Sequence, residues 1–291
     1  MIKKLLGIQP QLTEDGAYSP SPFSLKLATS AITDYEEINF NNRNKESSKR
    51  ILMLCTEEAN VPMTNGKYFS SGNHPVETLV PMLHMQNAGF EFDIYTPNGK
   101  PVKFEMWAMP QKDKNVKAIY DKYKAQFDNP KSLADLACNN FNIHYDYVAI
   151  YIPGGHGALL GLPWDKNVGN LIKWAFEKNI FHLSICHGPA ALLAAKPSND
   201  NEPFIYQGYK LAAFPDKVDR QTPLIGYMPG QLTWFFGEEL EKSGMTIVNT
   251  KADKTCFADR KLITGASPKA ANNFGKLCAA QLLGNTNHDE N

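Results

Sequence analysis

A series of short apolar runs, recurring along the chain from residue 50 onward, limits the fold more than any other feature of the sequence. The runs cover residues 51–55, 92–95, 147–152, 180–185, 210–214 and 245–248. Largely apolar runs of this length are typical of strands that are buried on both faces. Helical patterns fill several of the gaps between them. This alternation predicts an α/β fold, in which a parallel sheet is covered by helices on both faces.

Predicted helices and changes in composition divide the chain into segments. Apolar residues at helical spacing predict helices over residues 75–88, 165–178, 188–195, 231–243 and 268–283. Residues 102–142 interrupt the alternation with two further helical patterns, so we interpret them as a small inserted α/β subdomain. Residues 1–48 are rich in Pro, Ser, Asn and Asp, which predicts an N-terminal arm and linker. The core then covers residues 49–283, and residues 284–291 form a polar tail.

Composition narrows the classes of partner and the compartment. Thirty Lys plus Arg balance thirty Asp plus Glu, so the net charge is zero and no overall field draws the chain to nucleic acid or an anionic membrane. No apolar run approaches the ~18–20 residues of a membrane span, and the first residues lack the pattern of a signal peptide. The five cysteines are scattered and odd in number, which fits a reducing compartment. We expect a cytoplasmic protein without membrane partners.

Residues 180–191 are the most informative segment for chemistry. An apolar run leads into Cys186, His187 and Gly188, and small residues follow. This order predicts a nucleophile elbow, a sharp turn between strand and helix that lifts the cysteine above the sheet edge. The amide groups at the start of a helix favour a thiolate, which is the reactive form of cysteine. The alternative is an inert buried cysteine, which does not explain the small residues around Cys186.

A glycine loop follows the run at 147–152, at residues 153–157. Glycine lets a backbone approach a ligand closely. The amides of Gly154 and Gly155, at the carboxyl end of a strand, could form an oxyanion hole for a carbonyl attacked by Cys186. A tight structural turn is the alternative. A phosphate-binding loop fits less well, because no Lys-Ser or Lys-Thr pair follows the glycines.

Three further residues are candidates for proton transfer. Glu77 begins a predicted helix, and in a poorly hydrated pocket its raised pKa would suit a general base or a proton shared with the thiol; stabilising the helix dipole is the alternative. His187 and Asp216, the latter following the run at 210–214, could complete a Cys-His-Asp arrangement. Neighbouring side chains at a helix start diverge, so a purely structural His187 stays open. His156 is expected to shape the glycine loop rather than bind metal.

Other motifs accompany the elbow and the glycine loop. They lie at residues 65–67, 71–79, 107–110, 221–223, 225–230 and 259–262. With these motifs, the chain resembles the HchA-type heat-shock chaperone and glyoxalase III family, within the PfpI superfamily. The resemblance extends over nearly the whole chain.

The resemblance implies a flavodoxin-like core with a small added domain, a homodimer, and a triad of Cys186, His187 and Asp216 with Glu77 beside the sulfur. Three activities are implied for such a protein. They are glutathione-independent conversion of methylglyoxal to D-lactate, deglycation of proteins and nucleotides, and holdase binding of unfolded proteins. No cofactor is implied. The alternatives are a holdase without significant catalysis and a cysteine peptidase, for which the elbow would also serve.

The sequence departs from this family at one place. The better-known members carry a metal site of two histidines and a glutamate away from the cysteine, and the matching positions here are Gln86, Glu91 and Tyr123. An amide and a phenol are poor replacements for two imidazoles in a zinc site. We therefore expect weak or absent metal binding at these positions.

Overall fold

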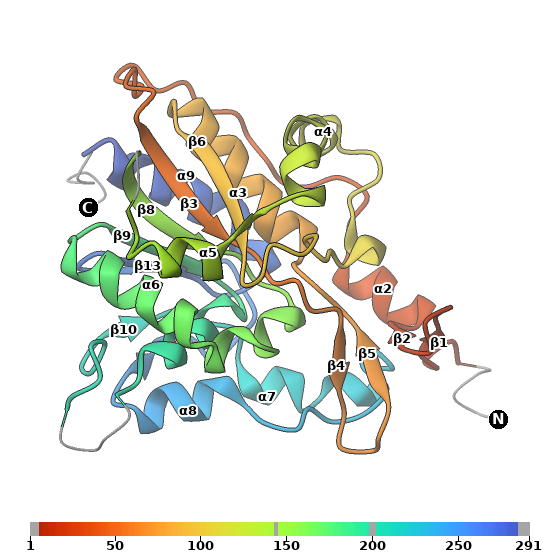
Figure 1. Ribbon diagram of the computed structural model, residues 1–291. Helices are drawn as coiled ribbons and strands as arrows, with labels where there is room; N and C mark the ends of the chain where they lie inside the picture. The colour runs from red at the N-terminus through yellow and green to blue at the C-terminus, as the bar shows by residue number, and fades with distance from the viewer. Residues whose placement is uncertain (1–5, 143–144, 198–201, 285–291) are drawn as a thin grey trace.

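A mostly parallel sheet forms the centre of the molecule. The computed structural model describes residues 6–142, 145–197 and 202–284, and within them the central sheet has seven strands in the order β12-β13-β9-β8-β3-β6-β7. The strands are β3 (Lys49–Leu54), β6 (Glu91–Thr96), β7 (Lys131–Ser132), β8 (Asp146–Ile152), β9 (Phe181–Ile185), β12 (Cys256–Asp259) and β13 (Leu262–Gly265). Neighbouring strands are parallel except for β12 with β13. The predicted α/β class, with a parallel-sheet core of the flavodoxin-like kind, is confirmed (Figure 1).

Helices cover both faces of this sheet. One face packs against α3 (Pro75–Asn87), α4 (Lys114–Asp128) and α9 (Ala271–Leu282), and the other against α5 (Leu133–Cys138), α6 (Lys166–Glu177), α8 (Phe236–Lys242) and the 3₁₀ helix η4 (Gly188–Ala195). Alternate residues of β3 enter the two cores, with Ile51 and Met53 on the α3 side and Leu52 and Leu54 on the α6 side. This alternation explains why β3 is apolar throughout.

Local signals at the helix starts agree with the predicted helices. The side chains of Asp113, Ser132 and Asp165 accept hydrogen bonds from first-turn amides of α4, α5 and α6. Such caps satisfy amides that have no partner inside the helix. Helix α3 begins instead at Pro75, which favours the first helical position. Its first turn carries Glu77 and lies at the carboxyl edge of the sheet.

Two predicted strands lie outside the main sheet. Residues 210–214 and 245–248 contribute β10 (Lys210–Leu211) and β11 (Thr246–Ile247), which pair with each other in parallel as a separate sheet. Their place in the main sheet is taken by β12 and β13. Strand β13 does not form an apolar run, because two of its four residues are Thr264 and Gly265.

Two predicted helices also differ from the structure. The helix expected over 231–243 begins only at Phe236, because Leu232 is held in a bridge to Met63. The segment 188–195 forms a 3₁₀ helix in place of an α-helix. The elbow cysteine therefore precedes a tighter and less regular turn than the sequence predicted.

The N-terminal segment is more ordered than the arm predicted over 1–48. It contains β1 (Gln11–Leu12), β2 (Tyr18–Ser19) and α2 (Pro22–Ala28). Strand β2 joins β4 (Asn60–Pro62) and β5 (Tyr68–Ser70) in a second sheet, with β1 at its edge. The Ser21 amide and the Ser24 hydroxyl both donate to the carbonyl of Gly226. Contacts to distant parts of the chain thus order the arm.

The other predicted boundaries stay predictions. Within 102–142, α4 packs against α3 and β7 pairs with β6, so this segment shares the layers of the core. The polar tail predicted over 284–291 lies outside the described residues apart from Gly284. In the described part of the chain, no helix is long and apolar enough to cross a membrane.

A buried carboxylate joins four strands at the amino end of the sheet. Asp93 on β6 is 5% exposed and accepts hydrogen bonds from Arg50, Lys131 and Tyr147, on β3, β7 and β8. Burial alone would raise the pKa of Asp93, but the hydrogen bonds from Arg50 and Lys131 outweigh burial and lower it. A carboxylate with a lowered pKa stabilises the folded state only while it is ionised.

Replacing Asp93 with Asn should lower the free energy of unfolding by about 1–3 kcal/mol at pH 7, because it leaves Arg50 half-buried without its partner. Urea denaturation would measure the difference. The wild-type advantage should be present above about pH 4 and disappear as the pH falls through the lowered pKa of Asp93. Asp128→Asn, which removes an exposed pair with Lys124, is the control and should change stability by less than about 0.5 kcal/mol. Equal effects of the two substitutions would contradict this account.

Candidate active site

Cys186 lies in the sharp turn that the sequence predicted after β9. Its φ is +61°, a left-handed conformation that is rare for residues other than glycine. Its amide donates to Gly265 at 2.8 Å, and its carbonyl accepts from the Phe214 amide at 3.0 Å. Hydrogen bonds on both sides thus hold a strained backbone in place, as is common at functional sites. The side chain is 3% exposed.

The glycine loop after β8 packs directly against this turn. A Cβ atom on Gly154 would lie 2.6 Å from the Ile185 carbonyl oxygen and 2.7 Å from the Cβ of Cys186, so only glycine fits. Gly155 has a φ of +110° and lines the same cavity as Cys186. Among the described residues, no hydrogen bond is formed by the amides of Gly154 and Gly155. They are therefore available to a bound oxygen.

Glu77 lies beside the sulfur from the first turn of α3. Its carboxyl group is completely buried, and neither oxygen has a conventional hydrogen-bond partner in the described parts of the chain. Burial raises the pKa of Glu77 well above its ordinary value. Burial and the neighbouring Glu77 likewise raise the pKa of Cys186. Burial thus favours the uncharged forms of both groups and opposes the thiolate that a helix start would favour.

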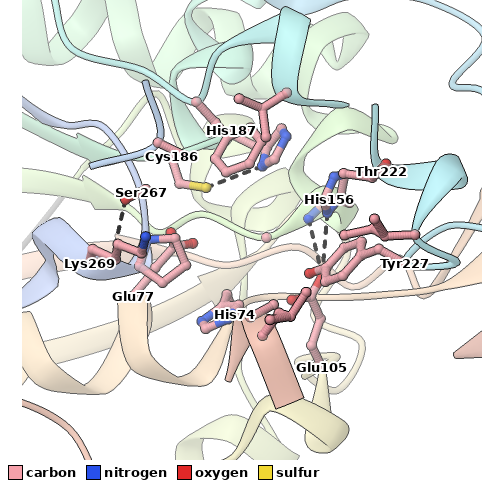
Figure 2. A pocket seen from close by; sticks show the side chains of 18 residues that line it. His74, Glu77, Glu105, His156, Cys186, His187, Thr222, Tyr227, Ser267 and Lys269 are labelled. Atoms are coloured by element: carbon pink, nitrogen blue, oxygen red, sulfur yellow. Dashed lines mark hydrogen bonds and ion pairs between the residues drawn. The ribbon is translucent and has the colours of Figure 1, made fainter. Parts of the chain in front are cut away.

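His187 contacts the sulfur directly, despite following it in sequence. The Sγ of Cys186 and the Nδ1 of His187 are 3.2 Å apart, and Figure 2 shows the sulfur facing the imidazole. The Nε2 of His187 is 2.8 Å from Oδ2 of Asp219. Burial, and the positive charge of His156 nearby, lower the pKa of His187 to about 4. His187 is thus a neutral imidazole that can accept the thiol proton.

The carboxylate in this arrangement is Asp219 and not Asp216, so the predicted partner of His187 was wrong. Asp216 begins the single turn of α7 (Asp216–Asp219), and its carboxylate accepts from the amides of Gly237 and Glu238 at the start of α8. Asp219, three residues later, is completely buried and bonds to the two histidines of the site. Both aspartates lie shortly after the apolar run at 210–214, so the sequence alone does not show which of them bonds to His187.

Two further residues of the site were missed or assigned a different role. His156, expected only to shape its loop, lies with Nε2 2.9 Å from Oδ1 of Asp219. Glu105 is buried and accepts hydrogen bonds from the Ser71 hydroxyl and the His156 amide. Glu105 follows no predicted strand, so no pattern in the sequence indicated it.

These side chains meet in a cavity of about 240 Å³ at the carboxyl edge of the sheet (Figure 2). Its polar lining comes from His74, Glu77, Glu105, His156, Cys186, His187, Thr222, Tyr227, Ser267 and Lys269, and its apolar lining includes Phe214, Val218 and Ile225. Leu27 and Ala28, at the end of α2, also line it, so the N-terminal arm helps to enclose the site. The cavity lies where strands β3 and β8 connect in opposite directions, a common ligand site in open α/β sheets.

Gln86, Glu91 and Tyr123, where the resemblance to the family places a metal site, meet in space, but a lysine joins them. Lys122 Nζ donates to Gln86 Oε1 at 2.7 Å and to Glu91 Oε1 at 3.0 Å, and the Tyr123 hydroxyl donates to Glu91 Oε2 at 2.5 Å. An ammonium group thus already supplies the positive charge, and the donor set does not fit zinc. Within the described chain, His156, His187 and Asp219 also have metal-ligating atoms close together, although these atoms already bond to one another.

Comparison with known proteins gives close relatives over the full chain. The model of the DJ-1/PfpI family matches residues 68–202. A protein/nucleic acid deglycase HchA from Escherichia coli O157:H7 is 47% identical over 275 residues, which cover 94% of this chain and 95% of that protein. A protein of the same name from Escherichia coli O1:K1 / APEC is 46% identical and covers 97% of this chain and 98% of its own.

Solved structures agree with the fold. The Rapid Encystment Protein 24 KDa of Francisella tularensis has a TM-score of 0.65 at 23% identity, covering 81% of this chain and 99% of that chain. Glyoxalase III from Candida albicans has a TM-score of 0.63 at 20% identity, covering 84% of this chain and 99% of that chain. At such identities the likeness concerns the fold alone.

Asp219→Asn should slow alkylation of Cys186 by iodoacetamide about 10- to 1000-fold at pH 7, because His187 loses the carboxylate that orients it and supports its charge. Mass spectrometry of the Cys186 peptide would follow the reaction. Asp216→Asn is the matched control and should leave the rate near that of the wild type, although it weakens the start of α8. A slower reaction in Asp216→Asn than in Asp219→Asn would overturn the assignment.

Zinc should not bind at the cluster around Lys122, which consists of Lys122, Gln86, Glu91 and Tyr123. We expect wild type and Glu91→Gln to show the same zinc stoichiometry after dialysis against micromolar Zn²⁺, since Glu91 is already occupied by the lysine and the tyrosine. Atomic emission spectrometry would measure the bound metal. One equivalent lost on substitution of Glu91 would establish a metal site there.

Proposed function

The chain belongs to the DJ-1/PfpI family, and from this premise we propose that it is a cysteine-dependent, glutathione-independent glyoxalase that converts methylglyoxal to D-lactate. We further propose deglycase activity on proteins and nucleotides that methylglyoxal has modified. Two proteins named protein/nucleic acid deglycase HchA are 47% and 46% identical to this chain over nearly its full length, which supports this class of substrate.

One observation carries the proposal: the sulfur of Cys186 lies between a neutral imidazole and a buried carboxyl group. His187 is in hydrogen-bond contact with the sulfur, and Glu77 lies beside it with a raised pKa. The reaction requires several proton transfers on a small molecule and no external redox partner. A thiol with two proton-transferring groups of different character supports such chemistry.

The first step forms a bond between sulfur and the aldehyde carbon. The Cys186 thiol gives its proton to Nδ1 of His187 as Sγ adds to the carbonyl, and Asp219 stabilises the imidazolium. The carbonyl oxygen gains negative charge and accepts hydrogen bonds from the amides of Gly154 and Gly155. Glu77 protonates this oxygen, or the His187 imidazolium passes the thiol proton on to it, which gives a neutral hemithioacetal and leaves the donor able to act as a base.

The next steps move hydrogen within the bound molecule. Glu77, as a carboxylate after giving up its proton, or His187 removes the proton from the former aldehyde carbon, which leaves an enediolate. Reprotonation at the neighbouring carbon produces the hydroxyl-bearing centre of lactate as a thioester, so one carbon is oxidised while the other is reduced. Water then cleaves the thioester, which releases lactate and restores the thiol. Deglycation would use the same attack on the early adduct of methylglyoxal with an amine or thiol, with that amine or thiol as the leaving group.

A holdase function is the second candidate. Leu12, Leu27 and Ile32 of the N-terminal segment and Leu224 of η5 (Thr222–Leu224) are each more than half exposed. Exposed apolar side chains of this kind favour binding of unfolded proteins. Such binding does not involve the sulfur, so Cys186→Ser should keep any suppression of aggregation. The homodimer and the cytoplasmic location remain predictions, and turnover of fluorogenic peptides would reveal a peptidase.

Wild type should form D-lactate from methylglyoxal without glutathione and in the presence of EDTA. Cys186→Ser should lower the rate by about 10³-fold or more, because the nucleophile is lost. Glu77→Gln should lower it by about 10²- to 10⁴-fold, since the amide cannot transfer the proton. An enzymatic assay with D-lactate dehydrogenase would measure the product.

Cys138→Ser is the matched control, because Cys138 is an exposed cysteine on α5. Its rate should equal that of the wild type. Turnover that persists in Cys186→Ser would contradict the thiol mechanism. Absence of turnover in all four proteins would favour the holdase function.

A further inference from the structure

Asp219 is shared by two histidines, which a simple Cys-His-Asp triad does not require. Its Oδ2 lies 2.8 Å from Nε2 of His187, and its Oδ1 lies 2.9 Å from Nε2 of His156. The two imidazole rings are tilted against each other with centroids 4.0 Å apart. Two adjacent imidazolium ions at this distance would repel strongly in a buried site, so at most one ring carries a charge at rest.

His156 has the surroundings that favour this charge. Besides Asp219, the carboxylate of Glu105 faces it, with Oε1 3.9 Å from Nδ1, and both imidazole nitrogens thus face carboxylates. Burial alone would lower the pKa of His156, but Asp219 and Glu105 outweigh burial and raise it. Among the described residues, His187 contacts a carboxylate through Nε2 alone, since its Nδ1 faces the sulfur.

We propose that His156 is a positioning residue that holds the resting positive charge of the site and, through the shared Asp219, keeps His187 neutral with its proton on Nε2. This inference rests on the proposed role of Cys186 as nucleophile. A neutral His187 with an unprotonated Nδ1 is the only form that can accept the thiol proton. His156 need not touch the substrate to have this effect.

The other groups packed around His156 are compatible with a single charge. His74 precedes α3, and burial and the charge of His156 lower its pKa to about 3, so it stays neutral. The remaining contacts are aromatic: Phe69 on β5, Phe214 and Tyr227 have ring centroids between 5.4 and 6.3 Å from that of His156. Burial raises the pKa of the Tyr227 hydroxyl, which therefore stays neutral as well.

Loss of the charge on His156 has a consequence of definite sign. Without it, the full negative charge of Asp219 acts on His187, and the repulsion that disfavours a second cation is removed. The pKa of His187 should rise from its low value. The pair of Cys186 and His187 would then take up an inactivating proton at higher pH.

NMR spectra of the wild type labelled with ¹⁵N-histidine test the proposal directly. At pH 6, His156 should have the shifts of an imidazolium, and His187 those of a neutral ring protonated at Nε2. Assignments would come from single substitutions. A charged His187 beside a neutral His156 would overturn the proposal, and this measurement requires no turnover.

The pH dependence of Cys186 alkylation, and of kcat/KM where turnover is found, provides a second test. In His156→Gln, the amide can still donate to Asp219 but carries no charge, so the acid limb should move up by about one pH unit or more. His84→Gln is the matched control, because His84 is another buried histidine that bonds to Asn272 at 2.8 Å, away from the cavity. Its acid limb should coincide with that of the wild type.

Equal acid limbs in His156→Gln and His84→Gln would overturn the proposal, since a merely structural histidine would not shift this profile. Failure of the proposed function would look different. Methylglyoxal turnover would then be absent from the wild type, while the NMR shifts and the alkylation profile would still report the charge on His156.

Discussion

The close approach of backbone segments at the carboxyl edge of β8 and β9 is the constraint on which the rest of the site depends. Gly154 leaves no side chain between its loop and the turn at Cys186, and a Cβ atom there would collide with that turn. The same gap admits the carboxyl group of Glu77 from the start of α3. Because the loops touch, the thiol and the carboxyl are side by side without a hydrated space between them. The strained backbone of Cys186 and the lack of a side chain at Gly154 therefore both belong to this close packing of the two loops.

Burial then decides the protonation states. An isolated ion in such an environment would be costly, so the thiol and Glu77 keep their protons and His187 stays neutral. Asp219 is a strongly favoured anion because it has two imidazole partners. Methylglyoxal is also uncharged, and its binding would disturb none of these states. New charge would appear on the substrate oxygen and on His187 as the sulfur attacks, when the amides, His187 and Asp219 are already in position. Such preorganisation is the principal way in which polar sites stabilise a transition state.

Most of the fold could be predicted because its signals are local. The buried strands β3, β6, β8 and β9 are largely apolar, and the long helices have regular apolar spacing, with aspartate caps on α4 and α6. The choice between Asp216 and Asp219 could not be predicted, because it depends on how a single helical turn is rotated between α8 and the cavity. Glu105 and the order of the N-terminal segment depend on contacts between residues far apart in sequence. The short strand β13 gave too weak a pattern for its place in the main sheet to be recognised.

The cluster around Lys122 lies at the end of α3 opposite to Glu77 and the active site. Gln86 lies in the last turn of the helix whose first turn carries Glu77, and Lys122 of α4 joins it to Glu91 on β6. A metal ion in this place would connect the same three elements. The ammonium group of Lys122 makes this connection as part of the chain, so no ion has to bind. It contributes fewer and weaker bonds than a coordinated metal, and it is partly exposed. The position of Glu77 therefore depends chiefly on the packing of α3 against α9 and β3, and the lysine adds a modest restraint at its far end.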